Sequence, residues 1–568
     1  MNNAGIVYTL HNECQDCYKC VRRCPVKSIR IQDGHAGILS EKCIGCGRCV
    51  APCPSNAKRV RCDLEPVKKL IASGKEVYVS LAPSWRASFS CTSRQMIATL
   101  KKLGFKGISE TALGAQEVSI ETARLLNQTD KGLVISSACP VIVKYIRLYK
   151  PELAQYIAPI ASPALTHAQL LKKTFGKDIA VIFIGPCIAK KDESDTHKHL
   201  IDFALTFEEL KIWLKETDTP IEEGDCLGQE FVPTHAHEGS LYPMDGGMCE
   251  TIKKIGVKDN VHLCPVCSLE SFNLAMTSFS QESLKNPVFI EALACFGGCM
   301  HGPCIATQLS DTNNISRVLR HVKHRDEIPT IPEVVVHEEH TPTPVEQTTY
   351  SMEDIRQALS KIGKFFPEDE LNCAGCGYQT CKEMAKALLN GNAEPSMCVS
   401  YMRKLAAKKA NAMLKNIPSA MIVLDKDLNI MEANEAFIKM FVTVGQDLYL
   451  ANPQKLVGLP IRFFFDAQKS FSSVLTGGKE IHKENYKYKN KFYDLHIFPI
   501  EPQVCIGAAI TNITTIIHSR EIVAQKAKEV IDKNISTVQQ IACLLGEHMV
   551  QTETILNTIA NEYNSDEE

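Results

Sequence analysis

The sequence predicts a multidomain α+β protein that holds several metal clusters. A chain of 568 residues is too long for one hydrophobic core, so roughly three to five domains are expected. Most of its 25 cysteines gather in three regions, and in a reducing compartment such cysteines are typical of metal or cluster ligands rather than disulfides. Short apolar runs alternate with amphipathic stretches between these regions, and the end of the chain has a purely helical period.

The composition excludes several classes of protein. Lys and Arg together number 63, against 65 Asp and Glu, and this balance provides no basic surface for nucleic acid. No run approaches the ~18 consecutive apolar residues of a membrane span, and the first residues lack the basic and apolar segments of a signal peptide. We therefore expect a cytoplasmic protein without a nucleic-acid or membrane partner.

The first cysteine region contains the spacing C-x2-C-x2-C-x3-C-P twice. Such tight spacing lets one loop place three thiolates around the corner of a cubane, while the fourth thiolate reaches the sister cluster. One 4Fe-4S cluster is then held by Cys14, Cys17, Cys20 and Cys53, and the other by Cys43, Cys46, Cys49 and Cys24. Residues 1–66 resemble a bacterial two-cluster ferredoxin, which is an electron relay. A pair of zinc sites is the alternative.

Residues 67–325 alternate strand-like and helix-like stretches, among them EVYVSLAPS, SRQMIATLKKLGF, GLVISSACP, DIAVIFIGPC and PVFIEALAC. This alternation predicts a mixed α/β domain whose chemistry lies in the loops that follow the strands. Cys139, Cys187 and Cys295 each stand at the end of such a strand. The loops after the strands are therefore the expected place of a metal site.

Three motifs in this domain are SSACP at 136–140, IGPCIAKKDE at 184–193 and EALACFGGC at 291–299. In this order, after a two-cluster ferredoxin, they resemble the signature segments of FeFe-hydrogenases. The resemblance implies an H-cluster, which is a four-iron cubane joined to a diiron centre with CO and cyanide ligands. It assigns the cubane to Cys139, Cys187, Cys295 and Cys299, with Cys299 also bridging to the diiron unit.

The same resemblance implies roles for residues beside the cluster. Lys190 matches a lysine that donates a hydrogen bond to a cyanide ligand, a task that suits an ammonium in a shielded pocket. Glu193 matches a carboxylate on the proton route. Gly297 and Gly298 are expected to let the backbone close around the cluster.

Several positions depart from the family pattern. Where catalytic members have a proton-carrying cysteine, this chain has Ala138. Ile142 replaces an expected Trp, and Gly185 and Leu293 replace expected Met residues. These changes remove proton donors and soft contacts around the diiron unit, so we expect slow turnover. The remaining candidate proton carriers, besides water, are Glu117, Glu121, His301 and Cys304.

The third cysteine region has the spacing C-x2-C-x4-C-x16-C, formed by Cys373, Cys376, Cys381 and Cys398. Three close ligands with a distant fourth suit one 4Fe-4S cluster at the start of a helix. Residues 352–405 resemble a small Fe-S domain of anaerobic redox proteins, and a zinc site is the alternative. Residues 326–351 are rich in Pro, Thr and Glu, which predicts an extended linker.

Residues 406–518 resemble a PAS domain, an α/β fold, through the IPSAMIVLD strand, the DKDLNIMEAN turn and a closing pair of strands. In residues 519–568, apolar or tolerant residues are spaced alternately four and three apart, as a coiled coil requires. These residues are Ile531, Ile535, Val538, Ala542, Leu545, Met549, Thr552, Leu556 and Ile559. We expect a parallel homodimer through this helix; the alternative is an amphipathic helix that packs on the PAS domain.

This order of domains resembles that of sensory FeFe-hydrogenases. The resemblance implies that H2 is split reversibly and slowly at the H-cluster, and that electrons pass through three 4Fe-4S clusters to bias the PAS domain and the output helix. Expected partners are H2 and protons, a redox carrier such as ferredoxin, hydrogenase maturation proteins and an unidentified signalling output protein. A ferredoxin-linked metabolic FeFe-hydrogenase and a non-catalytic Fe-S electron-transfer scaffold are the alternatives.

Overall fold

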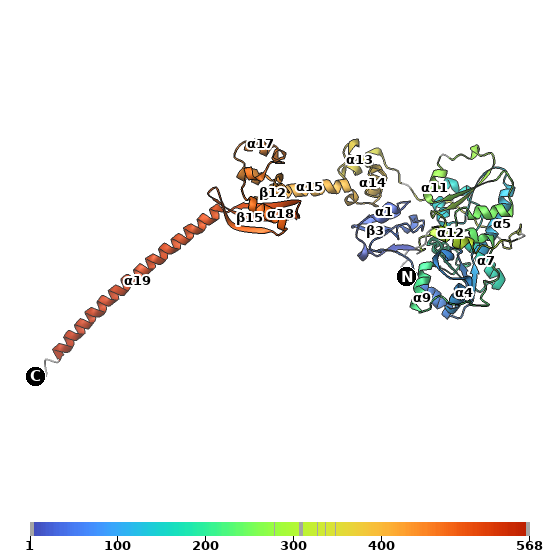
Figure 1. The fold of residues 1–568 in the computed structure, drawn as a ribbon, viewed down its shortest axis with the longest axis horizontal. Coiled ribbons are helices and arrows are strands. Elements are labelled where there is room, and N and C mark those ends of the chain that lie inside the picture. The colour runs from blue at the N-terminus through green and yellow to red at the C-terminus, as the bar shows by residue number, and fades with distance from the viewer. Residues whose placement is uncertain are drawn as a thin grey trace. The chain divides into compact units, whose positions relative to one another are not determined.

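The computed structural model describes residues 5–277, 279–305, 311–325, 328–334, 337–346 and 348–563. The chain divides into two compact units, residues 1–402 and 403–568, and each is described by itself (Figure 1). The outer ends of the first and last predicted domains, residues 1–4 and 564–568, lie outside the described residues. Within the described part of the chain, no helix is long and apolar enough to cross a membrane.

Two small antiparallel sheets form the N-terminal region of the first unit. They pair β1 (Val7–Thr9) with β4 (Lys58–Val60), and β2 (Ile29–Gln32) with β3 (His35–Ile38). The turn between β2 and β3 passes through Asp33 and Gly34 at φ values of 52° and 81°, a backbone that favours Asp-Gly in a two-residue hairpin. A short helix, α1 (Lys19–Arg23), lies within the first cysteine run.

A four-stranded parallel sheet forms the centre of the next domain. Its order is β6-β5-β8-β9, with bounds Gly107–Glu110, Val77–Leu81, Ala180–Gly185 and Phe203–Thr206. Every residue of β5 and β8 is buried, so both faces of the sheet are covered, as continuous apolar strands require. The main helices of this part are α4 (Ser93–Lys102), α5 (Ala112–Gln128), α7 (Pro163–Phe175) and α9 (Phe207–Glu216).

A second parallel sheet in the same domain has the order β10-β11-β7, with bounds His262–Cys267, Pro287–Leu293 and Gly132–Ile135. Helix α6 (Pro140–Tyr149) follows β7 and begins with Pro140, whose fixed φ and missing N–H suit a first helical position. The remaining helices are α2 (Leu64–Ala72), α3 (Trp85–Ser88), α8 (Ala189–Thr196), α10 (Gly247–Ile255), α11 (Leu269–Ala275) and α12 (Asp311–Leu319). The prediction of a mixed α/β domain is confirmed.

Residues 337–346, part of the predicted linker, form an extended segment that lies along this domain; we call this segment the strap. The backbone N–H groups of Thr343 and Val345 donate to the carbonyls of Arg147 and Leu148, both at 3.0 Å. The Arg147 Nε donates in return to the Thr341 carbonyl at 2.6 Å. The strap is therefore held to α6 by backbone hydrogen bonds.

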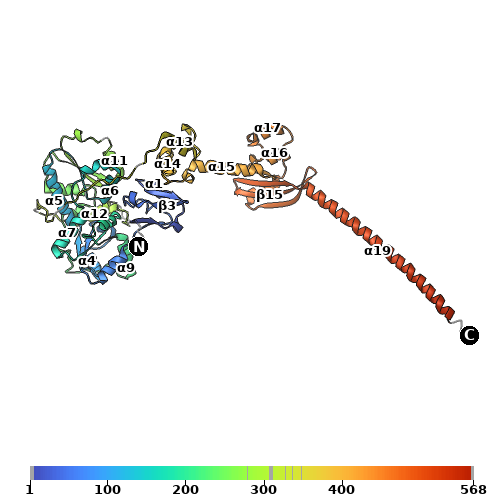
Figure 2. The ribbon, with the colours of Figure 1, turned by 180° about the vertical axis from the view of Figure 1, so that it is seen from behind.

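Helices α13 (Met352–Ser360) and α14 (Cys381–Leu389) form a small domain after the strap, and they pack beside the N-terminal region (Figure 2). The Ile31 N–H donates to the Asn392 carbonyl at 3.0 Å, and Ile31 is buried in one core together with Met384. The third cysteine region therefore shares a hydrophobic core with the first.

The second unit contains a five-stranded antiparallel sheet of order β13-β12-β16-β15-β14. The strands are β12 (Ala420–Asp425), β13 (Ile430–Ala433), β14 (Ile481–Tyr488), β15 (Lys491–Glu501) and β16 (Cys505–Asn512). Helices α16 (Glu435–Phe441), α17 (Gln446–Ala451) and α18 (Gln468–Gly477) accompany it, and α15 (Val399–Asn416) spans the boundary between the units. Phe437, Phe465 and Phe471 are fully buried in the core.

The chain continues into one 50-residue helix, α19 (Thr514–Tyr563). Its apolar residues, including Ile531, Val538 and Leu545, are 56%, 64% and 61% exposed in the single chain. An apolar line of this length is rarely left in water. The homodimer that the sequence predicts stays a prediction, and it would cover this line.

We expect Val538→Asp to weaken self-association, because a carboxylate would be buried in the apolar seam of a coiled coil. Gln540→Asp introduces the same charge two residues away, outside the apolar line, and should leave the association unchanged. Sedimentation velocity of the full chain measures both variants. A monomeric wild-type chain at micromolar concentration would contradict the dimer.

Candidate metal centre

One cavity in the mixed α/β domain is lined by four cysteines that are far apart in the sequence. Cys139 caps α6 after β7, Cys187 follows β8, and Cys295 and Cys299 follow β11. Parallel strands place their carboxyl ends on one side of a sheet, so loops from the two sheets can meet there. The structure therefore brings together the cysteines that the family resemblance assigned to the cubane, and their role as ligands stays a prediction.

Burial and neighbouring charges make several thiols of this cavity hard to deprotonate. Burial, reinforced by the charge of Cys139, raises the pKa of Cys187 to about 11. Burial and the neighbouring thiolates also raise the pKa of Cys295 and of Cys299. A cationic cluster would stabilise the thiolates, because metal coordination deprotonates a thiol and neutralises its charge.

Polar groups in the cavity wall fit a cluster that carries small anionic ligands. The Ser84 Oγ is buried and has no hydrogen-bond partner among the described residues. The Lys190 Nζ donates to Ser162 Oγ at 2.9 Å and to Glu193 Oε2 at 2.5 Å, with Lys190 at the cavity wall. Ser84 and Lys190 are thus two donors in a mostly apolar wall, and such donors match the needs of an H-cluster with cyanide ligands.

Aromatic packing accounts for one departure from the family pattern. A Cβ on Gly185 would lie 2.6 Å from the Phe183 ring and 2.9 Å from the Ala82 Cβ, so no larger side chain fits there. Phe183 lines the cavity, and the Lys190 Nζ lies 6.0 Å from its ring centroid. Sequence reasoning missed Phe183 and Ser84; the available signal was that Phe183 lies in the strand that leads to Cys187 and that Ser84 follows another buried strand.

The other departures fall at different places around the cavity. Ala138 and Leu293 line its wall, whereas Ile142 is buried in a neighbouring core. Gly298 has φ +91°, and a Cβ there would lie 2.3 Å from the Pro243 carbonyl oxygen. Only glycine combines that φ with so close an approach, so the backbone closes on the cavity as expected.

The four candidate proton carriers lie in different surroundings. The His301 Nδ1 is 3.2 Å from the Gly297 carbonyl oxygen. Cys304 is 2% exposed and packs with Ile6, Val7 and Ile188, outside the residues that line the cavity. Glu117 accepts a hydrogen bond from the Glu333 backbone, and Glu121 pairs with Arg124 at 2.7 Å.

The N-terminal cysteines form two groups. Cys24, Cys43, Cys46 and Cys49 line one small cavity. Cys14 and Cys17 lie close enough to Cys20 for their charges to raise its pKa, after the larger effect of burial. Cys24 therefore sits with the second run, as predicted for crossed ligand sets; the place of Cys53 in the other set stays a prediction.

The third cysteine region also surrounds a cavity, lined by Cys373, Cys376, Cys381 and Cys398. Cys381 opens α14, and its backbone N–H donates to Asn372 Oδ1 at 2.8 Å. Four thiols around one space suit a single 4Fe-4S cluster.

The cysteine groups follow one another closely. Cys46 is close enough to Cys295 for its charge to add to the pKa rise that burial gives Cys295. Burial lowers the pKa of Lys27, and Cys24 and Cys376 both lie close enough to Lys27 for their charges to raise this pKa. Lys27 therefore lies near cysteines of both the N-terminal region and the third cysteine region. The N-terminal cysteines therefore stand between the α/β cavity and the third cysteine region.

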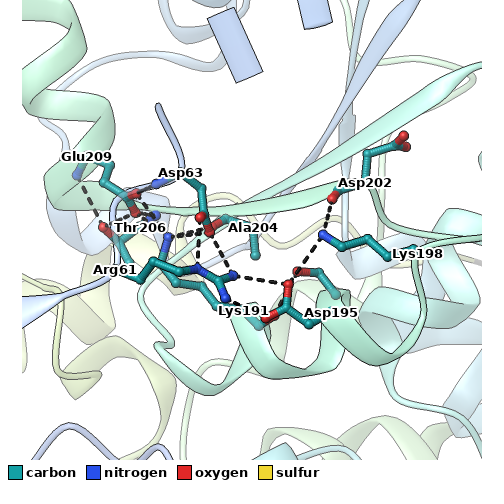
Figure 3. A network of polar contacts seen from close by, with 10 residues as sticks. Arg61, Asp63, Lys191, Asp195, Lys198, Asp202, Ala204, Thr206 and Glu209 are labelled. Atoms are coloured by element: carbon teal, nitrogen blue, oxygen red, sulfur yellow. Dashed lines mark hydrogen bonds and ion pairs between the residues drawn. The ribbon is translucent and has the colours of Figure 1, made fainter. Parts of the chain in front are cut away.

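An ionic network beside the cavity joins the N-terminal region to the α/β domain (Figure 3). Lys191 has no solvent exposure, and its Nζ lies 3.0 Å from Asp63 Oδ2 and 2.9 Å from Glu209 Oε2. The Nζ also donates to the Ala204 carbonyl at 2.8 Å. Arg61 extends the network, with its Nε 2.9 Å from Asp63 Oδ1. Lys191 adjoins Lys190, so the network anchors the start of α8.

Comparisons with known proteins agree with this site. The family model "Iron only hydrogenase large subunit, C-terminal domain" matches residues 75–303, a 4Fe-4S dicluster domain matches residues 6–54, and an Fe-S cluster domain matches residues 369–400. The chain thus contains the catalytic-type domain of an iron-only hydrogenase together with iron-sulfur domains. The resemblance to FeFe-hydrogenases is confirmed over residues 75–303.

Two curated relatives are each similar to part of this chain. Iron hydrogenase 1 of Clostridium pasteurianum is 24% identical over 290 residues, which cover 41% of this chain and 50% of the relative. The periplasmic Fe hydrogenase large subunit of Nitratidesulfovibrio vulgaris is 26% identical over 296 residues, 42% of this chain and 70% of the relative. The chain therefore spans half the length of the first relative and more of the second.

Solved structures are similar in parts. A variant of an FeFe-hydrogenase from Chlamydomonas reinhardtii has 16% identity and a TM-score of 0.39, and the match covers 50% of this chain and all of that one. The PAS domain of an HTR-like protein from Haloarcula marismortui has 20% identity and a TM-score of 0.16, covering 20% of this chain and 97% of that one.

We expect Lys191→Met to lower the free energy of unfolding of the α/β domain by roughly 3–5 kcal/mol, because Asp63 and Glu209 would stay buried without their partner. Trp85 and Trp213, the chain's 2 tryptophans, are both buried in this domain's core, so tryptophan fluorescence during urea unfolding reports on it. The control is Lys198→Met on an exposed ion pair, with an expected loss of about 0–1 kcal/mol. Equal losses would contradict this account.

Proposed function

We propose that this chain oxidises H2 slowly and reversibly at an H-cluster, and that the electrons pass through 4Fe-4S clusters to bias the PAS domain and the output helix. The observation that carries the proposal is the cavity lined by Cys139, Cys187, Cys295 and Cys299 together with Lys190. When bound, an H-cluster supplies the iron site at which H2 is split. The residues described above would hold it and serve it.

The chain's own residues have separate tasks in this proposal. Cys139, Cys187 and Cys295 would hold the cubane, and Cys299 would also bridge to the diiron unit. Lys190 would donate a hydrogen bond to an anionic ligand, and the apolar wall would exclude water and strengthen that bond. Glu193 would take protons beside Lys190. Ala138 offers no proton acceptor at the wall, which supports slow turnover.

Electron transfer outward is supported by the order of the cysteine groups. Oxidation of one H2 yields two electrons and two protons. The electrons would enter the cluster that includes Cys46, beside Cys295, and reach the Cys376 cluster past Cys24. The Cys376 cluster immediately precedes α15, which leads into the PAS domain. A redox carrier, maturation proteins and an output protein are the partners this function requires.

Infrared spectroscopy of the matured chain tests the site. We expect CO and cyanide bands that change under H2, and Cys299→Ser should abolish them because it removes a thiolate that would hold the cluster. Cys304→Ser removes a buried thiol outside the cavity wall and should keep the bands. A matured wild-type chain without the bands would instead support the electron-transfer scaffold, and turnover at the rates of metabolic hydrogenases would support the metabolic alternative.

Hydrogen exchange tests the signalling half of the proposal. We expect amides of the PAS domain and the first turns of α19 to change their protection between H2 and an oxidant, because a signal must alter the strain between fold and helix. A chain with Cys376→Ser lacks one ligand of the third cluster and should lose this difference. Identical amide protection of the wild-type chain under H2 and under the oxidant would contradict sensing.

A further inference from the structure

The cavity needs a proton exit that does not use position 138. Each H2 oxidised leaves two protons in the cavity, and Ala138 cannot take them. Lys190 stands at the cavity wall, and its Nζ is 2.5 Å from Glu193 Oε2, with both side chains 9% exposed. A proton that reaches this pair still has to cross the remaining protein to solvent.

Beyond Glu193, helix α8 ends at a histidine that contacts the strap. The His197 Nδ1 lies 3.1 Å from the Glu193 carbonyl oxygen, and its Nε2 lies 3.3 Å from Glu338 Oε1 in the strap. The side chains of His197 and Glu338 are 26% and 25% exposed. Lys190, Glu193, His197 and Glu338 therefore follow one another from the cavity wall towards solvent, and His197 contacts Glu193 through the Glu193 backbone carbonyl.

The strap holds Glu338 in place by contacts on both sides. The Glu338 backbone N–H donates to the Pro159 carbonyl at 3.3 Å. The His340 Nε2 lies 3.3 Å from the Ile160 carbonyl oxygen. Together with the hydrogen bonds to Arg147 and Leu148, these contacts position the carboxylate over the end of α8 rather than leaving it on a free linker.

The charges along this line alternate and act on one another. The hydrogen bond that His197 donates to the Glu338 carboxylate raises the pKa of His197. Burial by itself would raise the pKa of Glu338. The nearby His197, His340 and Lys190 outweigh burial and lower this pKa. Burial lowers the pKa of His340, and the positive charge of Arg147 lowers it slightly further. The negative charge of Glu338 acts in the opposite direction. The His199 ring also lies near, 6.0 Å from that of His197 between centroids.

We propose that Glu338 of the strap and His197 form the proton exit that serves Lys190 and Glu193, in place of the cysteine that Ala138 replaces. Lys190 would pass a proton to Glu193 and take the next one from the cavity. A water molecule would carry the proton from the Glu193 carboxylate to the His197 and Glu338 pair, and solvent would receive it there. The inference rests on the proposed function, because it concerns the protons that H2 oxidation releases.

The test compares Glu338→Gln with Glu339→Gln in the matured full chain. Both variants remove one negative charge from the strap, but Glu339 is exposed. We expect Glu338→Gln to lower kcat for H2 oxidation by about 10-fold to 100-fold, to leave KM for H2 unchanged and to increase the solvent isotope effect. Added imidazole should restore part of the rate, and Glu339→Gln should behave as the wild type.

A second readout is independent of turnover. In the same two variants, a nuclear magnetic resonance titration of the histidines should show a lower pKa for His197 with Glu338→Gln and no change with Glu339→Gln. Equal kcat values for both variants would overturn the proton exit, even with the histidine shift present. A wild-type chain that consumes no H2 would instead defeat the proposed function, and this inference with it.

Discussion

The burial of the Lys191 ammonium constrains how the N-terminal region meets the α/β domain. A charge without solvent exposure is tolerated only when anions and hydrogen-bond acceptors surround it, and Asp63 comes from one side of the junction while Glu209 and Ala204 come from the other. This requirement fixes the start of α8, and with it the neighbouring Lys190 at the cavity wall. The same contact therefore positions both a domain junction and a functional side chain.

Cationic contacts also hold the N-terminal region against its two neighbouring domains, as the proposed electron path requires. Arg48 donates to Glu270 at 2.9 Å and to the Ala294 carbonyl at 3.3 Å, next to Cys295. On the opposite side, Arg22 donates to the Cys17 and Gly375 carbonyls, at 2.8 and 3.4 Å. Cationic side chains thus bridge the N-terminal region to both neighbours.

Protons need a different route, because the cavity wall has Ala138 where the family resemblance implies a proton-carrying cysteine. The strap supplies the Glu338 carboxylate, and the end of α8 supplies the His197 imidazole, on the far side of Lys190 and Glu193. Its backbone hydrogen bonds to Arg147 and Leu148 belong to the same segment that leads to the third cysteine region. In the proposed function, the strap connects two redox domains and would also complete the proton route. A movement of these domains would then alter the proton route.

Much of the N-terminal site could be predicted from the sequence, because its ligands lie within a few residues of one another and tight spacing leaves few geometries. The cysteines of the α/β cavity were harder to predict. Only the order of three short motifs, read as a family resemblance, assigned Cys139, Cys187, Cys295 and Cys299 to one centre. Periodicity alone gave the strands and the C-terminal helix, since apolar spacing follows directly from helix and strand geometry.

Composition indicated that residues 326–351 lack a core of their own, and the strap indeed has none. It did not indicate which surface the strap covers, because backbone hydrogen bonds to Arg147 and Leu148 carry no sequence signal. For the same reason Ser84, Phe183 and Glu338 entered the site only through the tertiary structure. The sequence by itself determined which thiols and charges this protein has and how its segments are ordered. Tertiary packing alone decided which of them face one cavity, because side chains that are distant in sequence meet only where strand ends and loops converge.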